Sequence, residues 1–343
     1  MILLDDAQST TALPSSRLYE TALHYWRVLP SGDAKSDLIA IQACLEEISQ
    51  ALARGEFVVS AFAYEFGRLI HKLPVRSSQS DQPHPLIEAW SFADFKRLSK
   101  PEVDDCISQR LATLDPSQTN AGVIDVQESL DQKQFSADIA AIQEYIRSGD
   151  CYQINHTYRI TGKTYGSPLA LYSRLRDRQP GRFGAYIEHE DRFLLSQSPE
   201  LFIARDGDTL KAMPMKGTAS ALSTVASALS DDPKNQAENV MIVDLLRNDL
   251  SRISLPGSIS VPNLFEVARH GDVLQMTSTV QGQIKPDTSL FDIFTAVFPC
   301  GSVTGAPKKR SMEIIQELEP EDRGYYCGAL GWLDPNGDFA FSV

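Results

Sequence analysis

The chain has 343 residues, of which 42% are hydrophobic and 22% charged, values typical of a folded protein with a sizeable core. Its net charge of -13 argues against a general nucleic-acid binder or a protein that binds anionic membranes, because phosphate contacts need clustered cations. The five cysteines are widely spaced and form no C-x-x-C pair, which disfavours a disulfide framework or a zinc site. With no signal peptide and no apolar run long enough for a membrane span, we expect a cytoplasmic protein.

The first 130 residues contain one clear helix signal, followed by a buried strand over about 57–64. Two polar stretches, 74–85 and 115–122, have no apolar period and are predicted loops. Because both loops are short and no internal repeat occurs, we expect a single large domain over 1–343. The helix is predicted over about 39–54 from four apolar residues at helical spacing: Ile41, Leu45, Ile48 and Leu52.

A second helix is predicted after residue 131, with Gly149 as its stop signal. Residues 151–161 then alternate as a strand in which Gln153, Asn155 and Arg159 share one face. Such a polar face is ordinarily the solvated side of a sheet. A ligand-facing surface gives the same pattern, so the residues leave both alternatives open.

The segment 214–218 (PMKGT) places one lysine, Lys216, at a sharp turn after a predicted strand. Pro214 cannot donate a ladder hydrogen bond, and Gly217 tolerates backbone angles closed to other residues, so the Lys216 side chain can be aimed into a cavity. Lys216 is therefore a candidate nucleophile. The alternative is a solvated lysine, which is the more common case at a strand end.

The Asp206-Gly207 pair, between strands over about 192–204 and 209–215, predicts a hairpin. Counting back from this turn places Glu200 opposite Met213. Strict alternation would then put Lys216 on the other face of the sheet from Glu200. A site shared by these two residues requires a bulge or kink near Pro214.

A helix predicted over 231–253 presents Asn235 and Glu238 three residues apart on one face. Oxygen ligands in this arrangement suit magnesium, which takes one or two carboxylates together with waters and a substrate oxygen. The alternative is a solvated acidic helix start stabilised by the helix dipole. The sequence of this segment alone favours the second explanation.

The stretch 299–308 (PCGSVTGAPK) is a glycine-containing turn in which Pro307 can start a helix that runs to about residue 318. Exposed backbone N–H groups near Gly305 and Ala306 would bind a carboxylate, and a plain helix-start turn is an equally good explanation. A last hairpin, formed by 328–333 and 339–343, is still alternating at Val343. We therefore expect the natural protein to continue past Val343.

Eight segments carry a resemblance to a known family. The chain resembles the chorismate-utilising enzymes and, within them, the branch of aminodeoxychorismate synthase component I. The resemblance is dense over about 135–343 and weaker over 1–130, where it rests on FAYEFG. The segments are FAYEFG (62–67), GDCYQIN (149–155), SPELF (198–202), PMKGT (214–218), KNQAENVMIVDLLRNDL (234–250), QMTSTV (275–280), PCGSVTGAPK (299–308) and RGYYCGALGW (323–332).

The resemblance implies an α/β (α+β) fold in which two mainly antiparallel sheets pack together with helices outside. It implies a family-like N-terminal region over 1–130 and a chorismate-binding catalytic region over 131–343. The family continues beyond this point with an arginine for the pyruvyl carboxylate, a glycine-rich turn and a further glutamate for the metal. Little or no activity is expected of a molecule that truly ends at Val343.

The resemblance also implies roles for individual residues. Glu200 is implied as the general acid that assists departure of the chorismate C4 hydroxyl, and Glu238 as a ligand of Mg²⁺, which would bind the ring carboxylate. Lys216 is implied as the nucleophile that attacks C2 before ammonia adds at C4, whereas the anthranilate synthases have alanine there. The implied substrate-binding residues are Gln153, Gly217, Thr218, Thr304, Gly305 and Ala306.

The chemistry constrains the environment of the two central residues. A lysine must be neutral to attack, so its pKa must fall from about 10.4, and a carboxyl acid needs a raised pKa. A dry pocket produces both changes. The isochorismate and salicylate synthases, relatives that use water, carry a lysine base at the position of Gln153. Without that lysine water is poorly activated, so the resemblance implies that ammonia can be the nucleophile here.

We therefore predict an enzyme that converts chorismate and ammonia to 4-amino-4-deoxychorismate for p-aminobenzoate and folate synthesis. No Cys-His glutaminase constellation is evident, so the ammonia is expected from a separate glutamine amidotransferase component. The alternative within the family is anthranilate synthase component I. An alternative of another class is a non-catalytic homologue that binds an amidotransferase or a chorismate-like ligand.

Overall fold

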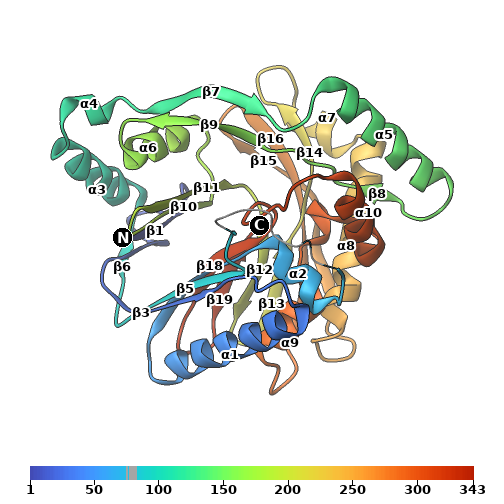
Figure 1. Cartoon of the computed structure of the whole chain (residues 1–343), viewed down its shortest axis with the longest axis horizontal. Helices are drawn as coiled ribbons and strands as arrows, with labels where there is room; N and C mark the ends of the chain where they lie inside the picture. The colour runs from blue at the N-terminus through green and yellow to red at the C-terminus, as the bar shows by residue number, and fades with distance from the viewer. Residues whose placement is uncertain (75, 77–82) are drawn as a thin grey trace.

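The computed structural model describes residues 1–74, 76 and 83–343, and packs two β-sheets face to face with helices outside (Figure 1). The strands within both sheets pair antiparallel. The predicted fold class is therefore confirmed. Most of the loop predicted over 74–85 lies outside the described residues, and the predicted loop over 115–122 contains the one-turn helix α4 (Pro116–Thr119).

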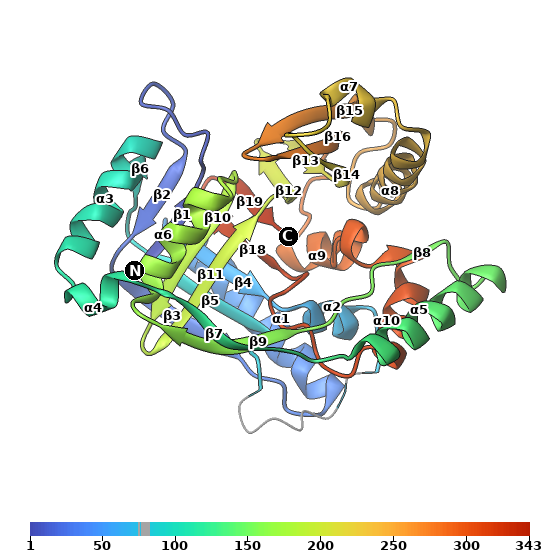
Figure 2. The same ribbon diagram turned by 90° about the horizontal axis from the view of Figure 1, so that it is seen from above.

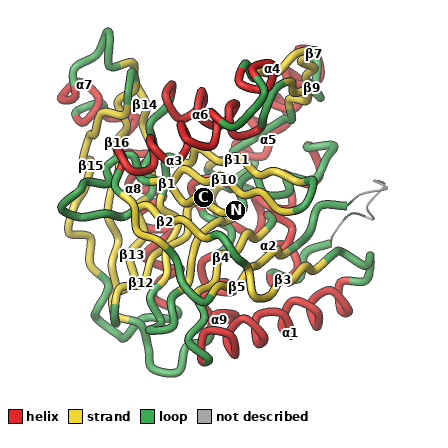
Figure 3. The backbone as a smooth tube through the Cα atoms, turned by 90° about the vertical axis from the view of Figure 1, so that its left-hand side faces the viewer, coloured by secondary structure: helices red, strands yellow, loops and turns green. Residues whose placement is uncertain are grey.

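The smaller sheet has the strand order β11-β10-β1-β2-β6. Successive side chains of a strand point to opposite faces, and both faces of β1 are buried. Ile2 is buried between the two sheets with Trp90, whereas Leu3 is buried against Tyr172 under the outer helices α3 (Lys100–Ala112) and α6 (Pro168–Arg178) (Figure 3). The five strands are β1 (Ile2–Asp5), β2 (Ser16–Tyr19), β6 (Lys96–Leu98), β10 (Phe183–His189) and β11 (Arg192–Ser198).

The larger sheet has ten strands in the order β14-β16-β13-β12-β19-β18-β4-β5-β3, with β15 paired to β16. Strands from before and after residue 130 share both sheets. The division into 1–130 and 131–343 stays a prediction, and the predicted last hairpin is confirmed as β18 and β19. The strands are β3 (Ala22–Val28), β4 (Phe57–Phe62), β5 (Ile87–Phe92), β12 (Leu201–Asp206), β13 (Thr209–Met213), β14 (Met215–Ser220), β15 (Ser260–His270), β16 (Val273–Gln283), β18 (Ala329–Leu333) and β19 (Phe339–Ser342).

Helix α1 (Ala34–Ala53) covers the outer face of the larger sheet (Figure 3). It begins five residues before the predicted start because the Asp33 side chain accepts a hydrogen bond from the Ser36 backbone N–H at 2.9 Å, which caps the helix. Among the described residues, no helix combines the length and apolar character needed to span a bilayer. The remaining helices are α2 (Tyr64–Ile70), α5 (Gln132–Arg147), α7 (Ala226–Ser230), α8 (Pro233–Ser251), α9 (Leu290–Val297), the 3₁₀ turn η1 (Gly301–Val303) and α10 (Lys308–Leu318).

Two short ribbons complete the structure: β8 (Gln153–Ile154) with β17 (Gly305–Ala306), and β7 (Gly122–Glu128) with β9 (Ile160–Tyr165) (Figure 2). The prediction of one continuous strand over 151–161 is wrong. Backbone groups there bond to other partners, since Asn155 N donates to Thr304 O at 3.0 Å and Thr157 N donates to a Glu319 carboxylate oxygen at 2.9 Å.

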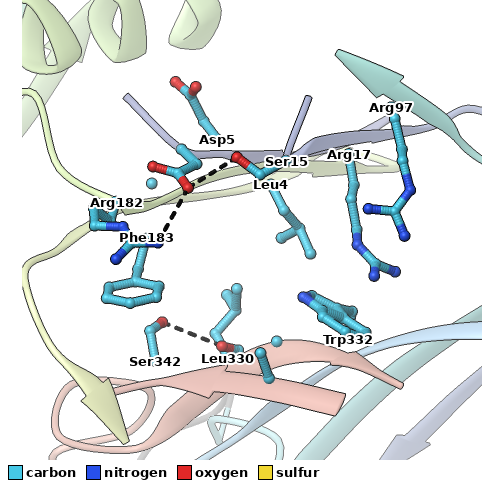
Figure 4. Close-up of a pocket in the computed structure, with 14 residues that line it drawn as sticks. Leu4, Asp5, Ser15, Arg17, Arg97, Arg182, Phe183, Leu330, Trp332 and Ser342 are labelled. Atoms are coloured by element: carbon cyan, nitrogen blue, oxygen red, sulfur yellow. Dashed lines mark hydrogen bonds and ion pairs between the residues drawn. The ribbon is translucent and has the colours of Figure 1, made fainter. Parts of the chain in front are cut away.

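Arg17 is one of the residues that connect the two sheets. The guanidinium of Arg17, on β2, stacks on Trp332 with 3.3 Å to the ring centroid and donates to both carboxylate oxygens of Asp334 at 2.7 and 3.0 Å. A cavity of about 240 Å³ lies beside this contact, lined also by Arg182 (Figure 4). None of the predicted site residues lines this cavity.

Two irregularities determine where Glu200 and Lys216 lie. The predicted pairing of Glu200 with Met213 is wrong, because the register shifts between Leu201 and Ala204 and Leu201 faces Met213 instead. Pro214 separates β13 from β14, and both strands pair with β16.

A bulge near Pro214, as expected from the sequence, is present in β14. Met215 pairs with Thr277 and Thr218 pairs with Gln275, so Lys216 and Gly217 together face the single residue between those two partners. Gly217 has a φ of +96°, a conformation that residues with a Cβ rarely adopt.

Replacing Gly217 with alanine is expected to destabilise the protein by about 1–2 kcal/mol, because of its positive φ and its packing. An added Cβ would lie 3.1 Å from Met276 Cε and 3.4 Å from Asn235. Urea unfolding measures the change. The matched control is Gly207→Ala, which also has a positive φ of +56° but no atom within 4 Å of its added Cβ. Equal losses in the two variants would contradict a packing constraint at the bulge.

Candidate active site

Glu200 lies between β11 and β12, and its side chain is buried, with only 5% of the residue exposed. Its Oε1 accepts a hydrogen bond from the Ser302 hydroxyl at 2.6 Å, and Cys300 Sγ lies 3.7 Å away. Burial raises the pKa of Glu200 to about 7, against the opposing effects of Ser302 and Lys216. Near neutral pH this carboxyl group therefore holds a proton that it can donate.

Lys216 stands on the bulge of β14, and its Nζ donates to the Ser302 carbonyl oxygen at 2.8 Å and to Asn155 Oδ1 at 3.2 Å. Burial lowers the pKa of Lys216, while the negative charges of Glu200 and Glu238 raise it. Ser302 thus contacts both central residues, with its hydroxyl on Glu200 and its carbonyl on Lys216. The structure brings together the two residues that the sequence analysis placed at the centre.

The two acceptors of Lys216 fit a neutral amine. A neutral lysine has two N–H bonds and one lone pair, and both contacts are with oxygen atoms that accept hydrogen bonds. With both N–H groups engaged, the lone pair is left free. This is the state that a nucleophilic lysine requires.

Most of the turn over 299–308 is buried, including Gly305 and Ala306, near which exposed backbone N–H groups were expected. Gly305 and Ala306 form β17 and pair with Ile154 and Gln153. A Cβ on Gly305 would lie 2.1 Å from the Gln153 carbonyl oxygen, so this close pairing requires glycine. The Thr304 side chain is fully buried and its hydroxyl bonds to Cys300 O at 3.1 Å. The role of Thr304, Gly305 and Ala306 in holding a substrate carboxylate stays a prediction.

Two buried polar atoms in the 153–155 segment, which includes the Lys216 acceptor Asn155, point to a missing partner. Within the described part of the chain, Gln153 Oε1 and Asn155 Nδ2 have no hydrogen-bond partner. Buried polar groups are nearly always paired in folded proteins, so such atoms are suited to a polar ligand. Arg159, predicted on the same face, instead donates to Asp322 O at 2.6 Å.

Gly217 and Thr218 differ in their surroundings. The Gly217 backbone packs against Asn235, at the start of α8. Thr218 is exposed on β14, and no hydrogen bond of its side chain occurs among the described residues. The substrate-binding roles expected for both residues remain predictions.

Glu238 is on α8, with 38% of its side chain exposed and Lys234 Nζ at 3.9 Å. Its helix α8 packs against β14, the strand that carries Lys216, and its negative charge raises the pKa of Lys216. No group of three His, Cys, Asp or Glu side chains suited to a metal occurs in the part of the chain that the structure describes. A single carboxylate fits magnesium only if waters and a substrate oxygen supply the other ligands.

Ser302 and Cys300 were not predicted as site residues, although both lie within PCGSVTGAPK. Their position in that motif was the available signal. The contact with Glu200 could not be found from sequence, because Glu200 is about one hundred residues earlier and the two segments meet only in the folded chain.

Comparisons with known proteins show the family to which this chain is similar. The model of the chorismate binding enzyme family matches residues 20–343. Aminodeoxychorismate synthase component 1 of Escherichia coli (strain K12) is 34% identical over 299 residues, which are 82% of this chain and 66% of that protein. The protein of the same name from Bacillus subtilis (strain 168) is 40% identical over 215 residues, 61% of this chain and 46% of that protein.

The chain thus spans about half to two thirds of the length of these curated relatives. Anthranilate synthase component 1 1 of Haloarcula marismortui is 32% identical over 83% of this chain and 66% of that protein.

The crystal structure of anthranilate synthase component I from Streptococcus pneumoniae TIGR4 has the same fold, with a TM-score of 0.77 and 21% identity over 97% of this chain and 83% of that chain. The family match covers nearly the whole sequence, and the fold is that of a chorismate-utilising enzyme. The chain belongs to the family of chorismate binding enzymes.

Proposed function

We propose that this chain aminates chorismate with ammonia to give 4-amino-4-deoxychorismate, a precursor of p-aminobenzoate and folate. One observation carries the proposal. The Lys216 amine and the Glu200 carboxyl group lie in one buried site, linked by Ser302, and burial shifts the pKa of each toward its neutral form. Among the curated relatives, several are named aminodeoxychorismate synthase component 1, which supports this branch of the family.

The proposed reaction has two displacements at one ring. The Lys216 lone pair attacks C2 of chorismate, the ring double bonds shift, and the C4 hydroxyl leaves as water with the proton of Glu200. Ammonia then adds at C4, the double bonds shift back, and the amine of Lys216 leaves C2. The excess proton of the new ammonium group returns to Glu200, so that chorismate and ammonia give the product and one water.

The surrounding residues would hold the substrate. Gln153 Oε1 and Asn155 Nδ2 supply an unpaired acceptor and an unpaired donor. Glu238 would hold Mg²⁺ together with waters and the ring carboxylate, and the ion would supply the positive charge that this carboxylate needs. We propose a separate glutamine amidotransferase as the source of ammonia and the cytoplasm as the compartment.

Anthranilate synthesis is the second candidate, because curated anthranilate synthases are also among the relatives. The observation against it is the half-buried Lys216, at the position where the anthranilate branch is expected to have alanine. Incubation of the naturally expressed protein with chorismate, ammonium and Mg²⁺ separates the two. Accumulation of anthranilate would decide for the second candidate, and binding of chorismate without any product would indicate a non-catalytic homologue.

Lys216→Ala is expected to reduce aminodeoxychorismate formation by roughly 10²-fold or more, because the nucleophile is removed. Product is measured by chromatography with ammonium as the nitrogen source. The control is Lys163→Ala, whose side chain is 76% exposed and whose loss should change neither rate nor melting temperature. An unchanged rate in Lys216→Ala would remove this lysine from the proposed role.

Glu200→Gln is expected to lower the rate by roughly 10²–10⁴-fold, and the wild-type rate should fall above about pH 7 as the proton of Glu200 is lost. Stability gives an independent test of the same pKa. Folding raises the pKa of Glu200 from 4.5 to about 7. Its ionisation therefore does not lower the free energy of unfolding below about pH 4.5, and lowers it progressively as the pH rises to about 7.

Urea unfolding should therefore show that raising the pH from 4.5 to 8 costs the wild type about 3 kcal/mol more than it costs Glu200→Gln. The exposed variant Glu190→Gln serves as the control and should follow the wild type. If the free energy of unfolding of wild type and of Glu200→Gln changed with pH in parallel, a raised pKa at this carboxyl group would be contradicted.

Glu238→Gln is expected to raise the Mg²⁺ concentration needed for half-maximal rate by roughly tenfold or more, since one of few carboxylate ligands is lost. The rate is measured in a magnesium titration after treatment with a chelator. Glu266→Gln, on β15, is the control. The same magnesium dependence in Glu238→Gln and wild type would exclude Glu238 as a ligand.

A further inference from the structure

Two motifs of the sequence, FAYEFG and RGYYCGALGW, have no part in the proposed chemistry. Both meet at Arg323, whose side chain is only 3% exposed. Arg323 lies on the segment between α10 and β18, and α2 supplies two of its neighbours. A guanidinium buried this deeply needs acceptors for most of its five N–H groups.

The Arg323 side chain reaches toward the residues that contact Lys216. One terminal nitrogen donates to the backbone oxygen of Asn155 at 2.7 Å, and the other donates to the backbone oxygen of Val303 at 2.9 Å. Asn155 is the residue whose Oδ1 accepts from Lys216, and Val303 directly follows Ser302, whose carbonyl accepts from Lys216. One arginine therefore holds both segments that supply the acceptors of the lysine.

The side chain and backbone of Arg323 are themselves held in place by Glu319, Tyr64 and Glu65. Its Nε and one terminal nitrogen donate to the two oxygens of Glu319 at 2.9 and 2.6 Å, a bidentate pair that fixes the plane of the guanidinium. The Tyr64 ring lies 4.7 Å below it. The buried Glu65 carboxylate accepts the backbone N–H of Arg323 at 2.8 Å and that of Gly324 at 3.0 Å.

We propose that Arg323 is a positioning residue that directs the lone pair of Lys216 toward the substrate by holding the Asn155 and Ser302 segments. The proposal rests on the proposed function, since the direction of the lone pair matters only for a lysine that acts as the nucleophile. In this proposal the FAYEFG motif, which is far from Arg323 in the sequence, holds Arg323 in place through Glu65 and Tyr64.

The test uses Arg323→Lys, which keeps the positive charge but cannot donate to Glu319, Asn155 and Val303 together in the same geometry. The first readout needs no turnover. It is the rate at which a small amine-acylating reagent labels Lys216, measured by peptide mass spectrometry relative to the exposed Lys163. The second readout is kcat and KM for chorismate with saturating ammonium, and the melting temperature checks that the variant is folded.

We expect labelling of Lys216 to rise several-fold in Arg323→Lys and kcat to fall by roughly tenfold or more, with a much smaller change in KM. The matched control is Arg310→Lys, an arginine on α10 that pairs with Asp150 and Glu313 near the surface, and it should change neither readout. Unchanged labelling and unchanged kcat in a folded Arg323→Lys would overturn the proposal.

A second variant covers the case in which Arg323→Lys does not fold. Glu65→Gln leaves the guanidinium in place but removes one of the two oxygens that hold the Arg323 and Gly324 backbone. It should change labelling and kcat in the same direction by a smaller factor, and no change in either would overturn the proposal. Increased labelling in a protein that forms no aminated product would support the positioning and reject the proposed function.

Discussion

The pairing of Leu201 with Met213 is the constraint on which the candidate site depends. If Glu200 faced Met213, strict alternation would send Lys216 to the other face of the sheet. Because the register shifts between Leu201 and Ala204, Glu200 lies one residue before the Leu201–Met213 pair and Lys216 lies three residues after it, so alternation places both on the same face. β14 continues the register of β13 past Pro214, and the bulge at Lys216 and Gly217, with the positive φ of Gly217, shifts the register only after Met215.

Burial of the two central residues then has opposite effects on their pKa values. It raises the pKa of Glu200 to about 7 and lowers the pKa of Lys216, so both move toward the neutral form. In water the same pair would be ionised. Ser302 is suited to either state of Glu200, because a hydroxyl can donate to a carboxylate and can accept from a carboxylic acid. Its 2.6 Å contact can therefore persist while the proton is given up and regained.

Sequence reasoning succeeded where local chemistry decides the outcome. The apolar period of α1, the hairpin of β18 and β19 and the need for a bulge near Pro214 follow from short-range rules, and the structure has all three. It failed where distant segments compete for the same backbone groups. The predicted strand over 151–161 is interrupted because its amides bond to the 299–308 turn and to Glu319. Ser302 and Arg323 both lie within recognisable motifs, but their contacts depend on such meetings and could not be predicted from those motifs.

The proposed substrate is a dianion and needs local positive charge, but two buried cations of this acidic chain are already paired with carboxylates. The buried Lys308 pairs with Asp249 at 2.7 Å, and Arg323 pairs with Glu319 at 2.6 Å. These cations hold the framework in place, and each would leave a buried carboxylate unpaired if it turned to a ligand. In the proposed reaction Lys216 must be neutral to attack. The carboxylates of the proposed substrate would then be balanced mainly by backbone groups and by an added cation, which is the physical argument for proposing magnesium beside Glu238.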